Sequence, residues 1–249
     1  MFNFFVEHEN LQQNIFHITG NDYNHIKNVL RMQVNDEFLV SCNGVSNLCR
    51  LHSFTQDAVL AEILQENYQN TELDTKIYLF QGIAKGEKME WIIQKCVELG
   101  CYEIIPTEMS RCVVKIEEKK KKQKQNRWQA ISESAAKQSK RTVIPSVLEP
   151  MSFKNAINYA KDLDLILVPY ENKRGMVATK EALNHIKAES KIGIFIGPEG
   201  GFAENEIEAL TSISGKTVSL GSRILRTETA AITAVSMCML YCEMNGETK

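Results

Sequence analysis

Residues 191–220 read KIGIFIGPEGGFAENEIEALTSISGKTVSL, and this stretch decides the fold. Its first apolar run, residues 191–196, predicts a buried strand, and residues 204–213 have the spacing of an amphipathic helix. A second short apolar run, residues 216–220, predicts another strand. A strand, a helix and a further strand in succession are typical of a parallel sheet covered by helices. The stretch therefore predicts an α/β domain.

The alternation of strands and helices extends outward from this stretch in both directions. Further strands are expected at residues 76–81, 103–106 and 163–168, and further helices at residues 86–99, 117–137, 178–187 and 228–243. Gly100 is placed to end the helix 86–99 in a left-handed conformation. The polar run 66–75 interrupts the pattern, so we expect the α/β domain to comprise residues 75–249.

Residues 1–70 have a different pattern, which predicts mainly β-structure. Runs rich in strand-forming residues lie at 2–6, 15–18, 37–42, 45–54 and 58–64. Asn43-Gly44 joins two of them and favours a type I′ hairpin, since both residues accept positive φ. One helix is expected at residues 22–30, with an apolar face made of Tyr23, Ile26, Val29 and Leu30. We therefore expect a small barrel or curled sheet as a separate domain.

The charges are distributed unevenly, although the formal net charge is only −2. Residues 1–72 carry three basic and nine acidic side chains, a net of −6. Residues 111–141 carry eleven basic and three acidic side chains, a net of +8. A polyanion responds to the local field more than to the net charge, so the segment 111–141 is a candidate surface for nucleic acid.

The cysteines and histidines predict neither a metal site nor a disulfide framework. The seven cysteines contain no C-x-x-C pair, and the five histidines do not cluster with them. Buried free thiols in a reducing compartment are the simpler interpretation. The N-terminus MFNFFVEHEN lacks the pattern of a secretory signal, and no apolar run is long enough to span a bilayer. We therefore expect a cytoplasmic protein without a membrane or metal partner.

Two loops of the α/β domain have unusual sequences. Ligands of parallel sheets bind beyond the carboxyl ends of the strands, and residues 197–202 (GPEGGF) follow the expected strand 191–196. Gly197, Gly200 and Gly201 allow a ligand to approach the main chain closely. The loop is neither a Walker loop nor a G-x-G-x-x-G dinucleotide motif. The sequence thus predicts a site for some other ligand.

The second loop, residues 220–230 (LGSRILRTETA), leads into the last helix. Thr227 is suited to the N-cap, and Glu228 would lie in the first turn, where the helix dipole favours a carboxylate. Arg226 is a cation at the positive end of the same helix, where it costs stability. This arginine therefore indicates an anionic partner.

Both loops closely resemble those of the SPOUT methyltransferases, and more narrowly those of the RsmE family, which methylates N3 of a uridine in 16S ribosomal RNA. The resemblance continues in the segments AKGEKME (84–90), QK (94–95), ELG (98–100), SRC (110–112), 127–141, NHI (24–26) and VLRM (29–32). It therefore covers nearly the whole chain, in several long motifs in the family's order.

The resemblance implies a fold, a cofactor and a partner. Residues 1–70 would be a PUA-like, RNA-binding β-barrel, and residues 75–249 a SPOUT-type parallel sheet with a deep trefoil knot. The cofactor would be S-adenosyl-L-methionine, and the protein would act as a homodimer on 16S rRNA within the assembled small ribosomal subunit. The residues implied to hold the cofactor are Val168, Pro169, Tyr170, Ile196, Gly197, Pro198, Glu199, Gly200, Gly201, Leu220, Gly221, Ile224, Leu225, Arg226, Thr229 and Ala230.

The reaction suggests roles for three charged residues. Uracil N3 loses a proton before it attacks, and Arg226 is expected to stabilise the negative charge that spreads onto O2 and O4. Glu228 or Glu199 is a candidate to accept the proton, although a carboxylate at a helix N-terminus is a weak base, so Glu228 is alternatively expected to orient Arg226 or cap backbone amides. The expected RNA contacts are Asn24, Arg31, Lys85, Lys88, Arg111 and Arg141.

Two other functions remain open at this point. A SPOUT ribose 2′-O-methyltransferase acting on transfer RNA would have the same fold and a different target. A non-catalytic RNA-binding protein would keep the barrel and lack the chemistry, although the intact loops argue against this alternative.

Overall fold

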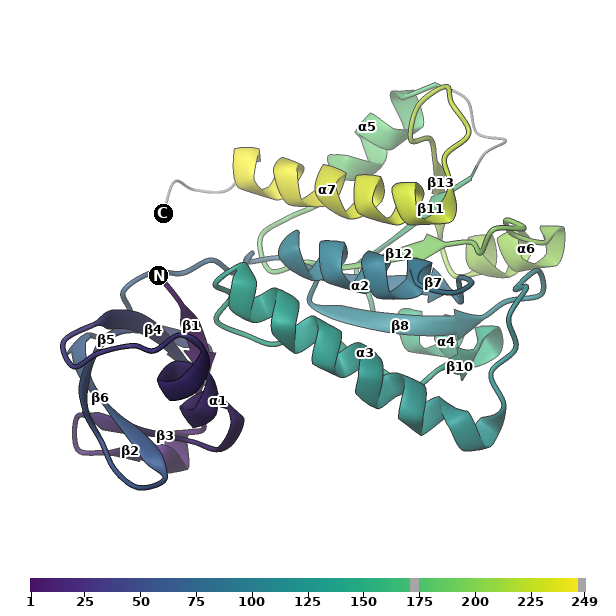
Figure 1. The fold of residues 1–249 in the computed structure, drawn as a ribbon. Coiled ribbons are helices and arrows are strands. Elements are labelled where there is room, and N and C mark those ends of the chain that lie inside the picture. The colour runs from purple at the N-terminus through teal and green to yellow at the C-terminus, as the bar shows by residue number, and fades with distance from the viewer. Residues whose placement is uncertain (171–174, 246–249) are drawn as a thin grey trace. The chain divides into compact units, whose positions relative to one another are not determined.

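The computed structural model describes residues 1–170 and 175–245. The chain folds into two compact units (Figure 1). Residues 1–72 and 136–144 form the first unit, and residues 73–135 and 145–249 form the second. This division differs from the expected one, in which residues 136–144 belong to the α/β domain. Asn3 Nδ2 donates to the carbonyl of Arg141 (2.9 Å). This hydrogen bond joins residues more than a hundred positions apart and holds the segment 136–144 in the first unit.

The first unit is a curled six-stranded sheet, with neighbouring strands antiparallel except for the first pair. Its strands are β1 (Asn3–Phe5), β2 (Leu11–Gln12), β3 (Ile15–Thr19), β4 (Glu37–Cys42), β5 (Val45–Phe54) and β6 (Ala58–Gln65), in the order β1-β4-β5-β6-β3-β2. Asn43 and Gly44 join β4 to β5 with φ of 48° and 78°, which confirms the predicted hairpin turn. Phe4, Phe16 and Phe38 fill the core inside the curl.

The helix of the first unit differs from the prediction. It begins as α1 (Gly20–Asn24) and continues as a π-helical turn, His25–Val29, in which Leu30 N donates to His25 O (2.9 Å). Ile26 is buried, but Val29 is 69% exposed, so placing Val29 on the apolar face was wrong. The wider turn holds more residues than an α-helical turn, which shifts the side chains that follow away from α-helical spacing.

The second unit is built on a parallel sheet, which confirms the predicted fold class. Its strands run in the order β10-β8-β7-β12-β11-β13, with β9 paired to β8, and every pairing is parallel. The strands are β7 (Lys76–Gly82), β8 (Glu103–Glu108), β9 (Ser146–Val147), β10 (Met151–Ser152), β11 (Leu165–Pro169), β12 (Lys191–Ile196) and β13 (Lys216–Val218).

Helices cover this sheet, and Figure 1 shows the C-terminal helix running beside the helix that follows β7. They are α2 (Lys88–Glu98), α3 (Glu118–Gln138), α4 (Phe153–Ala160), α5 (Val177–Leu183), α6 (Glu204–Ser212) and α7 (Thr227–Asn245). The inward face of α2 is Met89, Ile92, Ile93, Cys96 and Val97, and Gly100 follows it with φ of 89°. α4 was not predicted, although Ser152 caps it by accepting from Asn155 N (3.2 Å). Within the described residues, no helix combines the length and apolarity needed to cross a membrane.

Candidate active site

The site lies where neighbouring parallel strands end. Gln81 of β7 is in register with Ile196 of β12, and Pro169 of β11 is in register with Val218 of β13. The loops that leave these four strands therefore start from one edge of the sheet, as the sequence predicted. Tyr170 N donates to Val218 O (3.1 Å), so β11 and β13 stay paired as far as their loops.

The loop after β12 packs closely against Arg111. A Cβ built on Gly200 would lie 2.8 Å from Cβ of Arg111, so this position excludes any larger residue unless the chain moves. Arg111 Nη1 also donates to Gly200 O (3.2 Å). Gly201 has φ of 67°, the conformation that favours glycine. The glycines of this loop thus serve a turn and a close contact.

Glu206 joins this loop to the segment that holds Arg111. The carboxylate is buried, and its Oε1 accepts from the backbone N (2.7 Å) and the hydroxyl (3.0 Å) of Ser110. Its Oε2 accepts from Ala203 N (2.8 Å) at the start of α6. Glu206 is not predictable from the sequence, because alanine at 203 hides the Ser/Thr-x-x-Glu pattern of a capping box.

Glu199 connects the same loop to α2. Its Oε1 accepts from Lys85 N (3.0 Å) and lies 3.2 Å from Lys88 Nζ. Partial burial opposes ionisation of this carboxyl, but the Lys85 amide and the Lys88 ammonium outweigh it and lower the pKa of Glu199. A carboxylate with a lowered pKa is a weak base, so the structure favours an anchoring role for Glu199.

Thr227 connects the start of α7 to both β7 and the β12 loop. Its hydroxyl donates to Gly197 O (2.7 Å) and accepts from Gln81 Nε2 (3.0 Å). The predicted N-cap was wrong: Thr227 is the first residue of α7, and Ala230 N donates to Arg226 O (2.8 Å). The sequence analysis also missed Gln81, which has 0% exposure.

Arg226 and Glu228 lie on either side of Thr227. The Arg226 side chain is exposed, and its guanidinium has no hydrogen-bond or ion-pair partner among the described residues. The Glu228 side chain is only 8% exposed, and its Oε2 has no hydrogen-bond partner within the described chain. The nearest cation to that oxygen is Lys88 Nζ, at 3.7 Å. The start of α7 thus carries an exposed guanidinium at Arg226 and, two residues later, a buried carboxylate whose nearest cation is Lys88.

The other predicted cofactor residues surround the same strand ends. Ser219 N donates to Thr179 Oγ1 (3.0 Å), which fixes the start of the loop after β13. Farther along this loop Ile224 is 86% exposed and Leu225 is half-buried. Val168 is buried beneath the edge, whereas Thr229 is exposed on α7.

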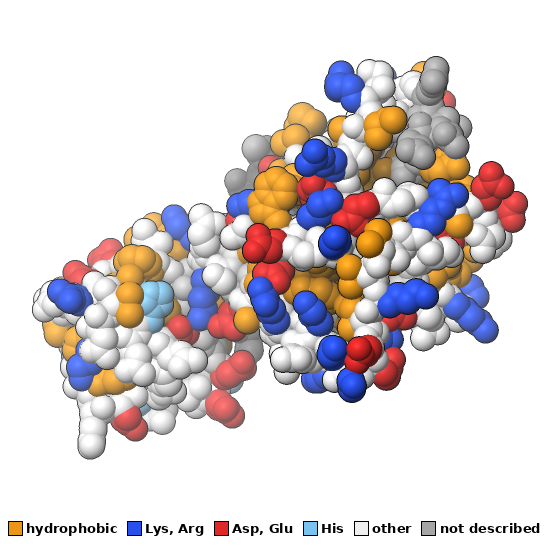
Figure 2. Space-filling model, turned by 45° about the vertical axis from the view of Figure 1, so that its right-hand side comes forward, with side chains coloured by type: hydrophobic (Ala, Val, Ile, Leu, Met, Phe, Trp, Pro, Cys, Tyr) orange, Lys and Arg blue, Asp and Glu red, His pale blue; other side chains and the backbone are white. Residues whose placement is uncertain are grey.

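The predicted RNA contacts fall into three groups. Lys85, Lys88 and Arg111 come together around the loop after β12, through the bonds to Glu199 and Gly200 described above. Asn24 and Arg31 are exposed in the first unit. Figure 2 shows many Lys and Arg side chains on one face of the second unit, interspersed with acidic ones.

Arg141 is placed differently. Its guanidinium is 4% exposed and forms an ion pair with Glu72 inside the first unit. Arg141 Nε lies 3.2 Å and 3.1 Å from the two carboxylate oxygens, and Thr142 N donates to the same carboxylate (2.9 Å). A guanidinium that is buried and paired in this way offers no surface to a phosphate, so we leave Arg141 out of the RNA contacts.

Comparison with known proteins matches both parts of the chain. A family model described as an RNA methyltransferase domain matches residues 71–239, and one described as an RNA methyltransferase PUA domain matches residues 18–51. Ribosomal RNA small subunit methyltransferase E of Bacillus subtilis is 40% identical over 233 residues, covering 92% of this chain and 91% of the relative. The protein of the same name from Mesomycoplasma hyopneumoniae is 34% identical, covering 96% and 99%.

Solved structures agree with the sequence matches. The ribosomal RNA small subunit methyltransferase E of Neisseria gonorrhoeae, bound to S-adenosyl methionine, is 31% identical with a TM-score of 0.82, covering 96% of this chain and 97% of that one. A putative methyltransferase from Legionella pneumophila in complex with the cofactor SAM is 29% identical with a TM-score of 0.83, with the same coverage. The predicted family is thus confirmed. The chain belongs to the RNA methyltransferase family, in the group of the ribosomal RNA small subunit methyltransferases E.

Proposed function

We propose that this protein transfers the methyl group of S-adenosylmethionine to N3 of a specific uridine in 16S ribosomal RNA. Membership of the family supports this, as do the relatives named for the small subunit and the two solved relatives that hold the cofactor. The observation that carries the proposal is the pair at the start of α7. There Arg226 and Glu228 are separated by one residue, at the edge where the strand loops meet: the Arg226 side chain is exposed, and the buried Oε2 of Glu228 has no hydrogen-bond partner in the described chain.

The loops at this edge of the sheet are the candidate cofactor site, since ligands of parallel sheets bind beyond the carboxyl ends of the strands. We propose that backbone groups of the loops after β11, β12 and β13 hold it, including those of Tyr170, Gly197 and Gly221. When bound, S-adenosylmethionine supplies a methyl group already activated by a positively charged sulfur. The residues therefore need mainly to align the reactants, and such alignment is worth roughly 7–11 kcal/mol.

Arg226 and Glu228 would act on the uracil base. N3 carries a proton at neutral pH, and its loss spreads negative charge onto O2 and O4. The Arg226 guanidinium stays ionised and can donate two parallel hydrogen bonds to that charge. The unpaired Oε2 of Glu228 is the acceptor we propose for the proton, with Lys88 stabilising the carboxylate from 3.7 Å. Glu199, held by its two donors, would instead anchor the loop.

The cations around the loop after β12 would bind the RNA backbone. Lys85, Lys88 and Arg111 all contact residues 199–200, so a phosphate bound there would lie beside the proposed cofactor loop. We propose Asn24 and Arg31 of the PUA-like unit as further contacts, and the assembled small subunit as the substrate. Such a substrate places the protein in the cytoplasm.

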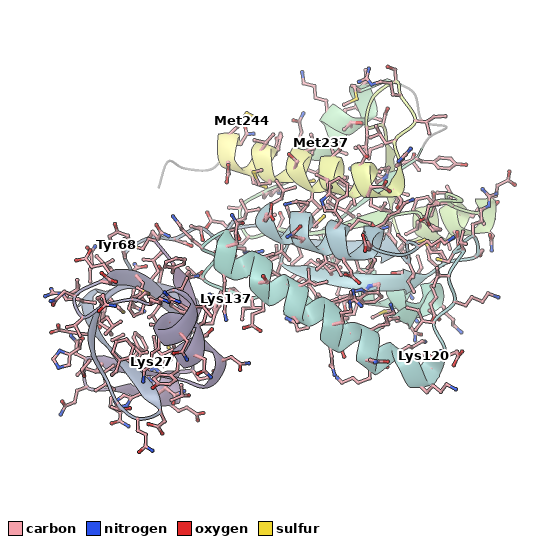
Figure 3. The ribbon with its side chains drawn as sticks, in the orientation of Figure 1. Lys27, Tyr68, Lys120, Lys137, Met237 and Met244 are labelled. Carbon is pink, nitrogen blue, oxygen red and sulfur yellow. The ribbon has the colours of Figure 1, made fainter. Side chains whose placement is uncertain are left out.

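We also propose a homodimer and a knotted chain. Figure 3 shows Met237 and Met244 on the side of α7 that faces away from α2, and Leu240, on the same helix, is 48% exposed. An apolar helix face of this kind fits a second copy of the chain. The knot is supported by the chain path: β13 is the edge strand, yet α7 follows it and begins against Gly197 and Gln81.

The decisive experiment is methyl transfer from labelled S-adenosylmethionine to small ribosomal subunits that lack the modification, followed by nucleoside identification. We expect 3-methyluridine. A ribose-methylated nucleoside, with transfer RNA as the better substrate, would support the 2′-O-methyltransferase alternative. Absence of transfer together with absence of cofactor binding in calorimetry would support the non-catalytic alternative.

A further inference from the structure

A chain of buried hydrogen bonds crosses the candidate site from β7 to the loop after β12. Gln81 Nε2 donates to Thr227 Oγ1 (3.0 Å), and Thr227 Oγ1 donates to Gly197 O (2.7 Å). A hydroxyl has a single proton. Because that proton is given to Gly197, the bond from the Gln81 amide must run toward Thr227. The direction of every step is therefore determined by the chemistry of the groups.

We propose that Gln81 and Thr227 are positioning residues for methyl transfer, which fix the first turn of α7 against the loop after β12. The inference rests on the proposed function, since Arg226 and Glu228 are the residues whose positions it would set. Thr227 lies between them in the chain, so anchoring its side chain fixes the backbone on both sides of it.

The burial of Gln81 supports a role beyond packing. The residue has 0% exposure, and its Nε2 uses both protons, on Thr227 Oγ1 and on Gly82 O (2.9 Å). Its Oε1 is buried without a hydrogen-bond partner in the described chain. A buried acceptor left unpaired costs about 1–3 kcal/mol, so an apolar side chain would suit stability better at this position. The glutamine is explained by the two bonds that it donates.

Close packing reinforces the same connection. A Cβ on Gly82 would lie 2.5 Å from Pro198 N, so the end of β7 touches the backbone of the β12 loop directly. The residues at 81 and 82 thus bind this loop in two ways, by the bonds through Thr227 and by contact with Pro198. Little freedom remains for the start of α7 while these contacts persist.

Removing these hydrogen bonds should slow the methyl-transfer step. A displacement of about 1 Å in a catalytic group can cost about 100-fold in rate. Thr227→Val removes the hydroxyl at nearly constant volume and breaks two of the hydrogen bonds at once. Thr227→Ser keeps the hydroxyl and should restore most of the rate. Gln81→Glu keeps the size, but a carboxyl has at most one proton, so it cannot make both of the bonds that the amide donates.

Thr75, next to the opposite end of β7, provides a matched control. Thr75 is as buried as Thr227 (5% against 6%), and its hydroxyl also donates to a backbone carbonyl, that of Lys187 (3.3 Å). Thr75→Val therefore removes a comparable bond far along the strand from the site. It should cost stability without changing the turnover.

The test measures kcat on small ribosomal subunits, together with the Kd values for S-adenosylmethionine and RNA and the melting temperature. We expect kcat to fall about 10- to 100-fold in Thr227→Val and Gln81→Glu, with both Kd values within about twofold of wild type. Thr227→Ser and Thr75→Val should remain near the wild-type kcat.

Three results would overturn the proposal. Wild-type kcat in folded Thr227→Val would show that the bonds do not position the site. Failure of both Thr227→Val and Gln81→Glu to fold would show that these hydrogen bonds serve folding and not the positioning of the site. An inactive wild-type protein would remove the proposed function and this inference together, so that failure is distinguishable from the first two.

Discussion

Lys88 and Glu199 form an ion pair of 3.2 Å that joins the first turn of α2 to the loop after β12. The same ammonium lies 3.7 Å from Glu228 in the first turn of α7, so one cation faces two carboxylates from different segments of the chain. Both carboxylates belong to the candidate site, and Lys88 connects them to α2.

Glu199→Gln should show a pH-dependent loss of stability. The pKa of Glu199 is lowered in the folded protein, so its contribution is fully present above the ordinary glutamate value and is lost as the pH falls through the lowered pKa. At pH 7 we expect a loss of roughly 0.2–1 kcal/mol, since the pair is partly exposed. Urea unfolding of both proteins at neutral and acidic pH checks this. A difference that stays constant down to about pH 3 would contradict it.

Glu206→Ala should destabilise the second unit by about 1–3 kcal/mol, because it removes a buried carboxylate that accepts three hydrogen bonds from Ser110 and Ala203. Chemical unfolding measures the loss. Glu204→Ala is the control, since Glu204 lies in the same helical turn and is exposed. Equal stabilities of the two variants would show that the buried carboxylate does not join these segments.

Arg226→Ala should lower kcat about 100- to 1,000-fold, the usual loss when one donor to a developing negative charge is removed. Arg226→Lys should recover only part of the rate, because an ammonium cannot donate two parallel bonds. Single-turnover methyl transfer at saturating RNA is the measurement. Arg223→Ala removes an exposed arginine of the same loop and should leave kcat unchanged. Undiminished turnover in Arg226→Ala would exclude the proposed role.

Lys85→Ala should change RNA binding, whereas Arg141→Ala should change the stability of the first unit. Losing one phosphate contact should reduce the slope of log affinity against log salt by about one in Lys85→Ala. Arg141→Ala should leave that slope unchanged and destabilise the first unit by about 3–5 kcal/mol, because it leaves the Glu72 carboxylate without its ion-pair partner. RNA binding at several salt concentrations, with thermal unfolding, separates the two. A reduced slope in folded Arg141→Ala would return that residue to the RNA contacts.

Leu240→Lys should produce monomers, because a charge on the exposed apolar face of α7 opposes burial against a second copy. Light scattering after size-exclusion chromatography gives the mass. Asn205→Lys, on the exposed side of α6, adds the same charge elsewhere and should leave the mass unchanged. A wild-type protein that is monomeric at micromolar concentration would contradict the proposed dimer.

The sheet and most helices were predictable because their signals are local. The apolar run 191–196 and the spacing of Met89, Ile92 and Cys96 depend only on neighbouring residues, and the structure confirms both. The glycine loop was predictable for the same reason. Its partners were not: Gln81 and Thr227 are separated by 146 positions, and no local pattern indicates that they meet.

The errors have similar causes. Val29 fits an α-helical face, but the π-helical turn before it changes the spacing. Arg141 lies in a basic segment, and only the folded chain brings Glu72 to it. Thr227 has the residue type of an N-cap, yet Gly197 offers its hydroxyl an acceptor from 30 positions away. For Arg141 and Thr227, a tertiary contact determines the role of the residue, whereas for Val29 the cause is the local helix geometry.

Because the first unit takes up residues 136–144, the backbone passes between the two units three times. A gene fragment that ends at Glu72 would lack residues 136–144 of the first unit. The Asn3 side chain would then lose its acceptor, the carbonyl of Arg141. We therefore expect that the first unit cannot be excised as one continuous segment of the chain. Swapping it between relatives requires two transplanted pieces, and a protease that cuts after Glu72 alone should not release it.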